Sequence, residues 1–380
     1  PVMTISIARK TLLHEWRRFL PATIAIAFSG VLMTVQGALL LGIVGANGLY
    51  VTQSTAAYWV GFPGTQSVDL GRAIPASVAT SLYAQPAISH VEPVLFGSGD
   101  WRGINGGGGV SVTVLGIETA NNSEALARII PQTLRNELNE PGTVLVDIAD
   151  ASKLSTKKGG VAEVNGRAVR IVGYIDGLRG LGGVNVVTSQ ETARNLDHSL
   201  PSDGGATYFL YDLKTGANGP AVQARLNSAT DIRRFEVWSA QELASMTTMY
   251  MLLDSGAGIA FIFATLIAVM IGAVITSQTL MGAVAGTVPQ YATLRALGVP
   301  FDRLRIIVVE QAGWVAFFGF IISLILSAAI ALAAAIYRVP FELRFSIVAA
   351  ASTVVLLVAA VACLLAIHRL RDTDPAMLLR

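Results

Sequence analysis

Cysteine and charged residues are both scarce in this chain. The single cysteine, Cys363, lies inside an apolar run, so no intrachain disulfide can form and cysteine usage does not indicate a redox compartment. Only 14% of the 380 residues are charged, against about a quarter in an ordinary soluble domain, whereas 53% are hydrophobic. The composition therefore predicts a membrane protein.

Motifs for enzymes and for nucleotide binding are absent as well. The sequence has no GxxxxGK[ST] phosphate loop, no GxSxG nucleophile turn and no HExxH zinc motif. It has four scattered histidines, His14, His90, His198 and His368. Asp147 and Asp150 follow a predicted strand, where capping of a helix and a carboxylate pair for acid–base work are the two alternatives. We expect no catalytic residue, no bound cofactor, no metal and no nucleic-acid partner.

Four apolar runs are long enough to cross a hydrocarbon core of ~30 Å as helices that rise ~1.5 Å per residue. They cover residues 19–46, 255–286, 306–337 and 345–367. We expect the first run to be a retained span and not a removed signal peptide, because it is too long and lacks a cleavage pattern. Glu310, near one end of the third run, is expected at the membrane interface, with a proton relay as the alternative.

The charges divide into two populations. Residues 47–250 carry 15 Lys or Arg and 18 Asp or Glu, a net charge of −3, whereas the remaining residues carry 12 and 7, a net charge of +5. Ten of the basic residues near span ends lie in residues 1–18, 287–305 and 368–380, against two in the short turn 338–344. The positive-inside rule then predicts cytoplasmic termini, a cytoplasmic loop at 287–305 and an extracytoplasmic domain at 47–254.

The N-terminal segment 1–18 has apolar residues at helical spacing opposite a basic side. It predicts an amphipathic helix in the membrane surface, in contact with lipids; a solvated helix of a soluble domain is the alternative.

The domain at 47–254 is predicted to be α+β and to consist of two subdomains. We expect strands at 56–70, 89–101, 110–117, 143–147, 184–188, 207–213 and 233–238 and helices at 75–84, from 190, at 219–226 and at 240–250. The first strand could pair with the one at 110–117. Asn165-Gly166 predicts a hairpin at 161–175. A β-rich subdomain is expected to be inserted at 121–200, and a stalk helix at 240–254 to continue into the second span.

Small residues four apart in the second run could let helices approach closely in lipid. They are Ala268, Gly272, Gly282 and Gly286. The alternative is that these glycines are tolerated without a packing role.

The loop between the second and third spans carries the most specific pattern. Its segment Gln290–Gly298, QYATLRALG, resembles the cytoplasmic motif of MacB/FtsX-like ABC transporter permeases, and the ending DPAMLLR at 374–380 resembles their Asp-Pro-x-x-x-Leu-Arg ending. One span, a large domain and three further spans also resemble this superfamily. The loop and the chain length are most similar to DevC-type permeases.

The resemblance implies a non-catalytic subunit of the bacterial inner membrane that works by mechanotransmission. It would form a homodimer, receive a cytoplasmic ABC ATPase that binds the ATP, and act with a periplasmic adaptor and an outer-membrane channel. Because the spans have no polar tunnel, we expect export of a hydrophobic or lipid-like substrate. The alternatives are an FtsX-like regulator of a cell-wall hydrolase and a permease that handles haem or lipoproteins.

The coupling residues implied by the resemblance are Gln290, Tyr291, Leu294, Arg295, Ala296, Leu297 and Gly298. Tyr291, Leu294 and Leu297 would form an apolar ridge beside the guanidinium of Arg295. In the alternative, these three pack against their own helices. Many relatives have Glu where this chain has Gln290, so a salt bridge to the ATPase at this position is not expected to be essential.

Overall fold

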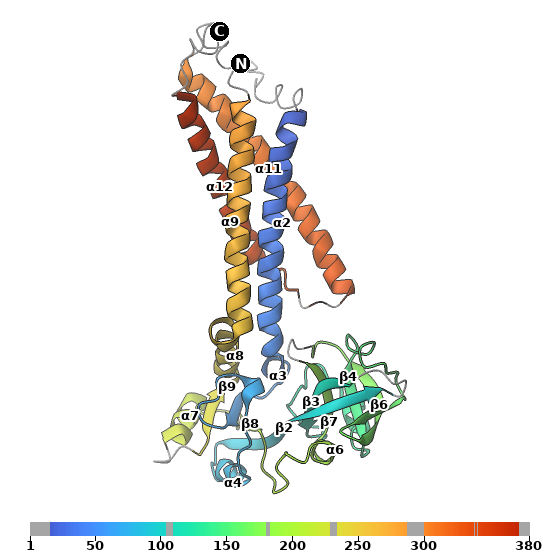
Figure 1. Ribbon diagram of the computed structural model, residues 1–380. Helices are drawn as coiled ribbons and strands as arrows, with labels where there is room; N and C mark the ends of the chain where they lie inside the picture. The colour runs from blue at the N-terminus through green and yellow to red at the C-terminus, as the bar shows by residue number, and fades with distance from the viewer. Residues whose placement is uncertain are drawn as a thin grey trace. The chain divides into compact units, whose positions relative to one another are not determined.

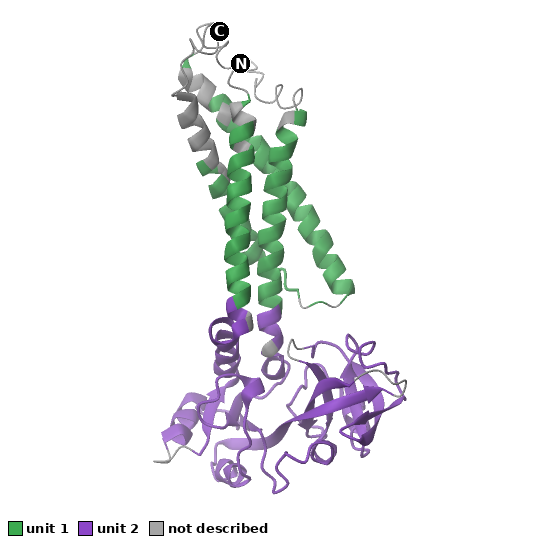
Figure 2. Cartoon of the chain, viewed as in Figure 1, with its two compact units in different colours: residues 1–42, 260–380 green, residues 43–259 purple. Residues whose placement is uncertain are grey.

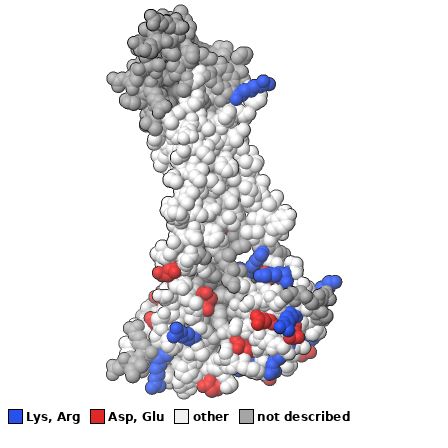
Figure 3. Space-filling model, viewed as in Figure 1, with Lys and Arg blue, Asp and Glu red and all other residues white. Residues whose placement is uncertain are grey.

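The computed structural model describes residues 16–103, 109–179, 183–228, 234–286, 300–337, 339 and 341–371. The chain divides into two compact units, residues 1–42 with 260–380 and residues 43–259 (Figure 2). Coloured charges gather on the second unit in the view of Figure 3, while the described surface of the long helices is mostly uncharged. The charge-rich region that the sequence places at residues 47–250 therefore belongs to the second unit, and the long uncharged runs belong mostly to the first.

Long apolar helices make up the first unit. They are α2 (Trp16–Asn47), α9 (Gly256–Ala285), α11 (Phe301–Ile336) and α12 (Phe345–Arg371) (Figure 1). Three stretches are long and apolar enough to cross a membrane, Phe19–Ala46, Gly258–Thr279 and Val309–Ile336. In α12 the apolar stretch within the described residues is Phe345–Val358, so the fourth span stays a prediction.

Helix α2 is the centre of this unit. A Cβ on Gly37 would lie 3.0 Å from Ile347 of α12, and a Cβ on Gly319 of α11 would lie 2.7 Å from Ile26. The Ser29 hydroxyl donates to the Gly272 carbonyl of α9 at 3.1 Å. Within its apolar stretch α2 is 44% buried, against 17% for α9 and 28% for α11. The first span therefore touches the other three, and α9 is left mostly exposed.

The second unit contains a four-stranded antiparallel sheet built from the two ends of its sequence. Its elements in chain order are β1 (Tyr58–Gly61), α4 (Ser77–Tyr83), β2 (Ile88–Gly103), β8 (Tyr208–Leu213), α7 (Gly219–Ser228) and β9 (Glu236–Ser239). The strand order is β9-β1-β8-β2, all antiparallel. A β-α-β-β-α-β chain in this order is the ferredoxin-like, split βαβ arrangement.

A closed barrel is inserted between β2 and β8. Its other strands are β3 (Val110–Ile117), β4 (Thr143–Asp147), β5 (Val161–Val164), β6 (Arg167–Ile175) and β7 (Val184–Ser189). The order β3-β7-β4-β6-β5-β2 closes because β2 pairs with both β5 and β3. Val112 with Val114, and Val144 with Val146, alternate along their strands and belong to one buried cluster.

The long strand β2 belongs to both sheets, and this explains why the predicted subdomain boundary at 121 differs from the structure. Residues 88–94 of β2 pair with β8, and residues 95–103 pair with β3 or β5. The barrel therefore starts within β2 and includes β3. No break in composition marks this point, because the chain crosses from one sheet to the other without a turn.

Two further expectations differ from the structure. The strand expected at 56–70 covers only Tyr58–Gly61, followed by a short 3-10 turn at Val68–Leu70. It pairs with β8 and β9, not with the strand at 110–117. The predicted hairpin is confirmed: β5 and β6 pair antiparallel around Asn165 and Gly166, whose φ angles are 50° and 79°.

The stalk does not continue as one helix into the second span. Helix α8 (Ala240–Met249) runs into a π-helical turn at Tyr250–Asp254, and Ser255 is extended, with φ −78° and ψ 136°. The Ser255 hydroxyl accepts from the Gly258 amide at 3.0 Å, which caps the start of α9. A Cβ on Gly258 would lie 1.8 Å from the Met251 carbonyl, so this close turn requires glycine.

Candidate functional site

The predicted coupling segment lies outside the described residues. Its seven residues, between Gln290 and Gly298, all fall within the stretch 287–299, which the structure does not describe. The N-terminal helix expected at 1–18 is described only from Trp16, and the tail is described to Arg371. The roles given to these segments stay predictions.

The four small residues of the second span have different surroundings. Ala268 is buried, and a Cβ on Gly272 would lie 2.9 Å from the Met33 side chain and 3.1 Å from Ser29. A Cβ on Gly282 would meet no atom of the described chain within 4 Å, and Gly286 is exposed. The structure thus brings Gly272 against α2 and buries Ala268, whereas Gly282 has no such neighbour among the described residues and Gly286 is exposed.

A buried charge network occupies the loop before and along α5 (Gln132–Glu137). Glu92 of β2 is fully buried and Arg135 of α5 is 1% exposed. The Ser123 hydroxyl joins them, because it donates to Glu92 Oε1 at 2.6 Å and accepts from Arg135 Nη1. Arg135 also donates to the carbonyls of Glu118 and Ala125, at 2.9 and 2.7 Å. Burial raises the pKa of Glu92 and lowers that of Arg135, and each charge opposes the shift of the other.

His90, Glu92 and Glu118 place ligand atoms within 4.8 Å of one another, the spacing of a metal site. The hydrogen bonds of Glu92 argue against that use. Its two oxygens accept from the Ser123 hydroxyl and from the amides of Glu124 and Ala125. These contacts use the lone pairs that a metal would need. The cluster is a hydrogen-bonded part of the domain core and does not fit a metal.

The same loop holds the segment by which the chain enters the domain. The Thr55 amide donates to the Glu124 carbonyl at 3.0 Å, and the Leu126 amide donates to the Ser54 hydroxyl at 2.9 Å. Burial and the neighbouring carboxylate of Asp212 raise the pKa of Glu124 to about 8. Asp212 in turn accepts from the Ala57 amide at 3.1 Å. Residues 54–57 are therefore fixed to the barrel loop on one side and to β8 on the other.

Asp147 and Asp150 lie at a turn and do not cap a helix. The carboxylate of Asp147 accepts from the amides of Ala149 and Leu178, both at 2.8 Å, and residues 148–155 are turns. Asp150 lies 3.9 Å from the Nε of Arg179. These bonds hold the turn after β4 in place.

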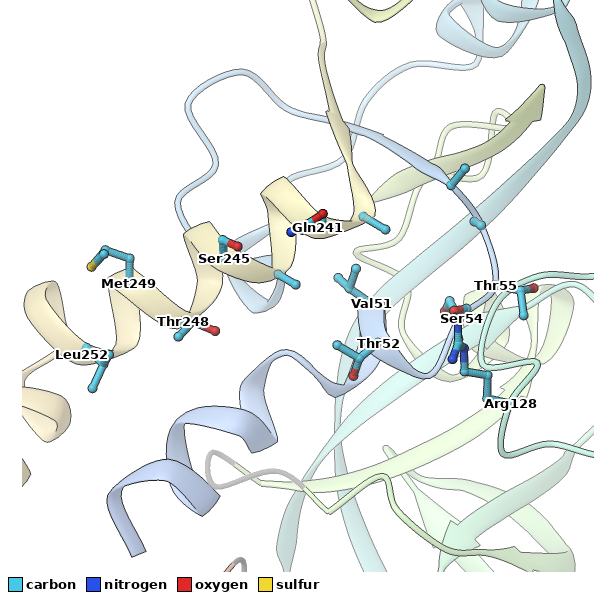
Figure 4. Close-up of a pocket in the computed structure, with 14 residues that line it drawn as sticks. Val51, Thr52, Ser54, Thr55, Arg128, Gln241, Ser245, Thr248, Met249 and Leu252 are labelled. Carbon is cyan, nitrogen blue, oxygen red and sulfur yellow. Dashed lines mark hydrogen bonds between the residues drawn. The ribbon is translucent and has the colours of Figure 1, made fainter. Parts of the chain in front are cut away.

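A groove of about 760 Å³ lies between α8 and the entry segment, and no sequence signal had indicated it. The segment includes the short helix α3 (Leu49–Thr52) and continues to Ala57. Figure 4 shows Gln241, Ser245, Thr248, Met249 and Leu252 along one wall, with Val51 and Thr52 facing them. Arg128 lies at the end formed by Ser54 and Thr55. Its volume is that of a small-molecule site.

Comparison with known proteins identifies a domain in the C-terminal part of the chain. Residues 259–375 match the model of the FtsX-like permease C-terminal family. The chain carries an FtsX-like permease domain. The predicted relation to MacB/FtsX-like permeases is thereby confirmed for this part of the chain. The match includes the predicted coupling loop and the second and third spans.

Three solved structures are also similar to part of this chain. The periplasmic region of MacB from Actinobacillus actinomycetemcomitans is 14% identical, with a TM-score of 0.37, 51% of this chain and 94% of that chain covered. The extracellular domain of YknZ from Gram-positive bacteria is 11% identical, with a TM-score of 0.34 and coverages of 48% and 100%. A permease domain from Porphyromonas gingivalis is 14% identical, with a TM-score of 0.32 and coverages of 48% and 88%. No curated protein matches the chain.

Proposed function

We propose that this permease transmits an ATP-driven conformational change across the inner membrane to export a hydrophobic or lipid-like substrate. The observation that carries the proposal is the FtsX-like match over residues 259–375, which contains the loop 287–305 between two apolar helices. Both termini and this loop lie in the cytoplasm, and the unit 43–259 lies outside. The chain itself binds neither ATP nor a metal, and the partner ATPase binds the nucleotide.

The subunit works as a homodimer with a periplasmic adaptor and an outer-membrane channel. The exposure of α9 supports a second copy in the membrane, since only 17% of its apolar stretch is buried within this chain. Absence of Asp, Glu, Lys and Arg from residues 19–45 and 255–286 supports an apolar cargo, because these spans offer no polar path.

Affinity purification of the full chain from native membranes tests the proposal. The wild type should co-purify with a separate ATPase, and Arg295→Glu should lose that partner, because a carboxylate cannot replace the donors of a guanidinium. Gln290→Glu should keep it. The matched control is Arg102→Glu, an exposed arginine of β2 in the other unit, which should co-purify as the wild type does.

Two results would contradict the proposal. If Arg295→Glu retained the ATPase, the loop would not be the docking element. If the wild type came without any ATPase, the transporter function would be wrong for this chain.

A further inference from the structure

The groove between α8 and residues 51–57 has one charged end. Arg128 is exposed there, and its Nε donates to the Ser54 carbonyl at 3.3 Å, which holds the guanidinium beside the groove. No Asp or Glu is among the residues that line it, and Arg128 has no ion pair with a described residue. This contrasts with residues 47–250 as a whole, whose net charge is −3. The charged end is therefore suited to an anion.

The opposite end is apolar. Met249 is 56% exposed, and Leu252 follows it along the same wall (Figure 4). Gln241 and Leu252 are eleven residues apart, so at ~1.5 Å per residue this wall is ~16 Å long. An acyl chain that spans half of a ~30 Å hydrocarbon core has about the same length.

Both walls begin close to the ends of spans along the chain. Val51 is five residues beyond Ala46, where the first span ends, and Leu252 is six residues before Gly258, where the second begins. Six residues reach ~20 Å at most. The apolar end of the α8 wall is also the end that leads into the second span. A lipid could therefore enter with its acyl chain next to the membrane.

We propose that this groove binds a membrane lipid with an anionic headgroup, with the acyl chain along α8 and the headgroup at Arg128. The inference rests on the proposed function for its role in export, where the groove would hold the lipid-like substrate. Binding itself requires neither the ATPase nor the loop at 287–305.

Photo-crosslinking of the full chain in nanodiscs tests the groove directly. The probes are phosphatidylglycerol and phosphatidylcholine that carry the same photoactivatable acyl chain, and the cross-linked peptides are mapped by mass spectrometry. Phosphatidylglycerol should label residues 241–249 at least about fivefold more than phosphatidylcholine, since a charge-assisted hydrogen bond contributes about that ratio or more. Equal labelling by the two lipids would overturn the assignment of the headgroup to Arg128.

Variants separate the headgroup contact from the groove. Arg128→Gln should reduce phosphatidylglycerol labelling to the phosphatidylcholine level, whereas Arg128→Lys should keep the preference. Ser245→Trp should block labelling by both lipids, because the indole fills the groove from an exposed position. The matched control Ser81→Trp, on the exposed side of α4, should leave labelling unchanged. If Ser245→Trp were labelled at residues 241–249 as strongly as the wild type, the groove would not be the binding site.

Inorganic phosphate in excess distinguishes a lipid from a small anion. It should leave the labelling unchanged, because the apolar wall contributes to the affinity for the lipid; displacement by phosphate alone would overturn the proposal. The two proposals can fail separately. Lipid labelling without a co-purifying ATPase would contradict only the transporter function, and a co-purifying ATPase without labelling would contradict only the groove.

Discussion

The buried polar side chains of the two units differ in kind. Among the described residues of the membrane unit they are uncharged and include Ser29, Thr34 and Thr276. Those of the unit 43–259 include the ions Glu92 and Arg135. In the membrane, Ser29 bonds to carbonyls of its own helix and of α9. A charged side chain in the lipid core costs too much free energy to be balanced by one such hydrogen bond. In a domain that folds in water, several hydrogen-bond donors and an opposite charge can surround a buried ion.

The difference means that the two units depend on different contacts. The membrane unit depends on helices that approach closely at small residues, such as Gly272. The other unit depends on a network in which each charge is needed to balance the other. Removing one member should therefore affect each unit in a different way.

The largest effect is expected from Arg135→Met. The substitution leaves Glu92 buried without its balancing cation, which costs about 3–5 kcal/mol in the free energy of unfolding. Denaturant unfolding of the full chain, followed by circular dichroism, measures it. The control Arg102→Met, whose side chain is 69% exposed, should change stability by less than about 0.5 kcal/mol. Equal stability of the two variants would show that the network is not balanced as described.

An intermediate effect is expected from Gly272→Leu in the membrane unit. Its side chain would meet Met33 and Ser29, and overpacking of this kind costs about 1–3 kcal/mol. Gly282→Leu is the matched control, because a Cβ there meets no described atom. The melting temperature, measured by thermal unfolding in detergent, should be lower for Gly272→Leu than for the wild type and unchanged for Gly282→Leu. A similar loss in both would mean that the contact with α2 does not decide the effect.

Glu124→Gln is expected to change how the stability of the unit 43–259 depends on pH. Glu124 has a pKa of about 8 in the folded state and an ordinary value of 4.5, so between these values the folded state binds more protons than the unfolded state. Its contribution to stability is complete below pH 4.5 and is lost as the pH rises to 8. The change is at most about 1.4 kcal/mol per pH unit.

The measurement for Glu124 is the difference in melting temperature between the wild type and Glu124→Gln from pH 4.5 to 8. The wild type should become less stable relative to the variant as the pH rises. The exposed Glu163→Gln serves as control and should follow the wild type. Parallel curves for wild type and Glu124→Gln would contradict the raised pKa.

Local chemistry explains which elements the sequence could predict. The hairpin at 161–175 depends on two adjacent residues that accept positive φ, Asn165 and Gly166, and helix α6 (Gln190–Leu196) begins where Ser189 caps it. Pairing between distant strands has no such signal. The strand near residue 58 therefore received the wrong partner, and β2 was not expected to belong to two sheets.

The site follows the same division. Motif resemblance indicated the relation to FtsX-like permeases, which is confirmed, and the coupling role of the loop, which stays a prediction; both depend on contiguous residues. The groove requires Val51 and Leu252, some two hundred residues apart, to line one cavity, and neither carries a recognisable motif. Glu92 and Arg135 look like surface charges in the sequence, and only the fold buries them. Sequence patterns do not encode such tertiary proximity.

Closure of the barrel also affects how the domain meets other proteins. The barrel strands form a closed ring, so the open edges among the described strands belong to the four-stranded sheet: β9, which has only four residues, and residues 88–94 of β2. Short edges offer little template for the addition of a foreign strand. The barrel is thus protected against sheet-to-sheet aggregation. A protein that binds the barrel must recognise side chains and surface shape, because the ring of strands leaves few backbone groups unpaired.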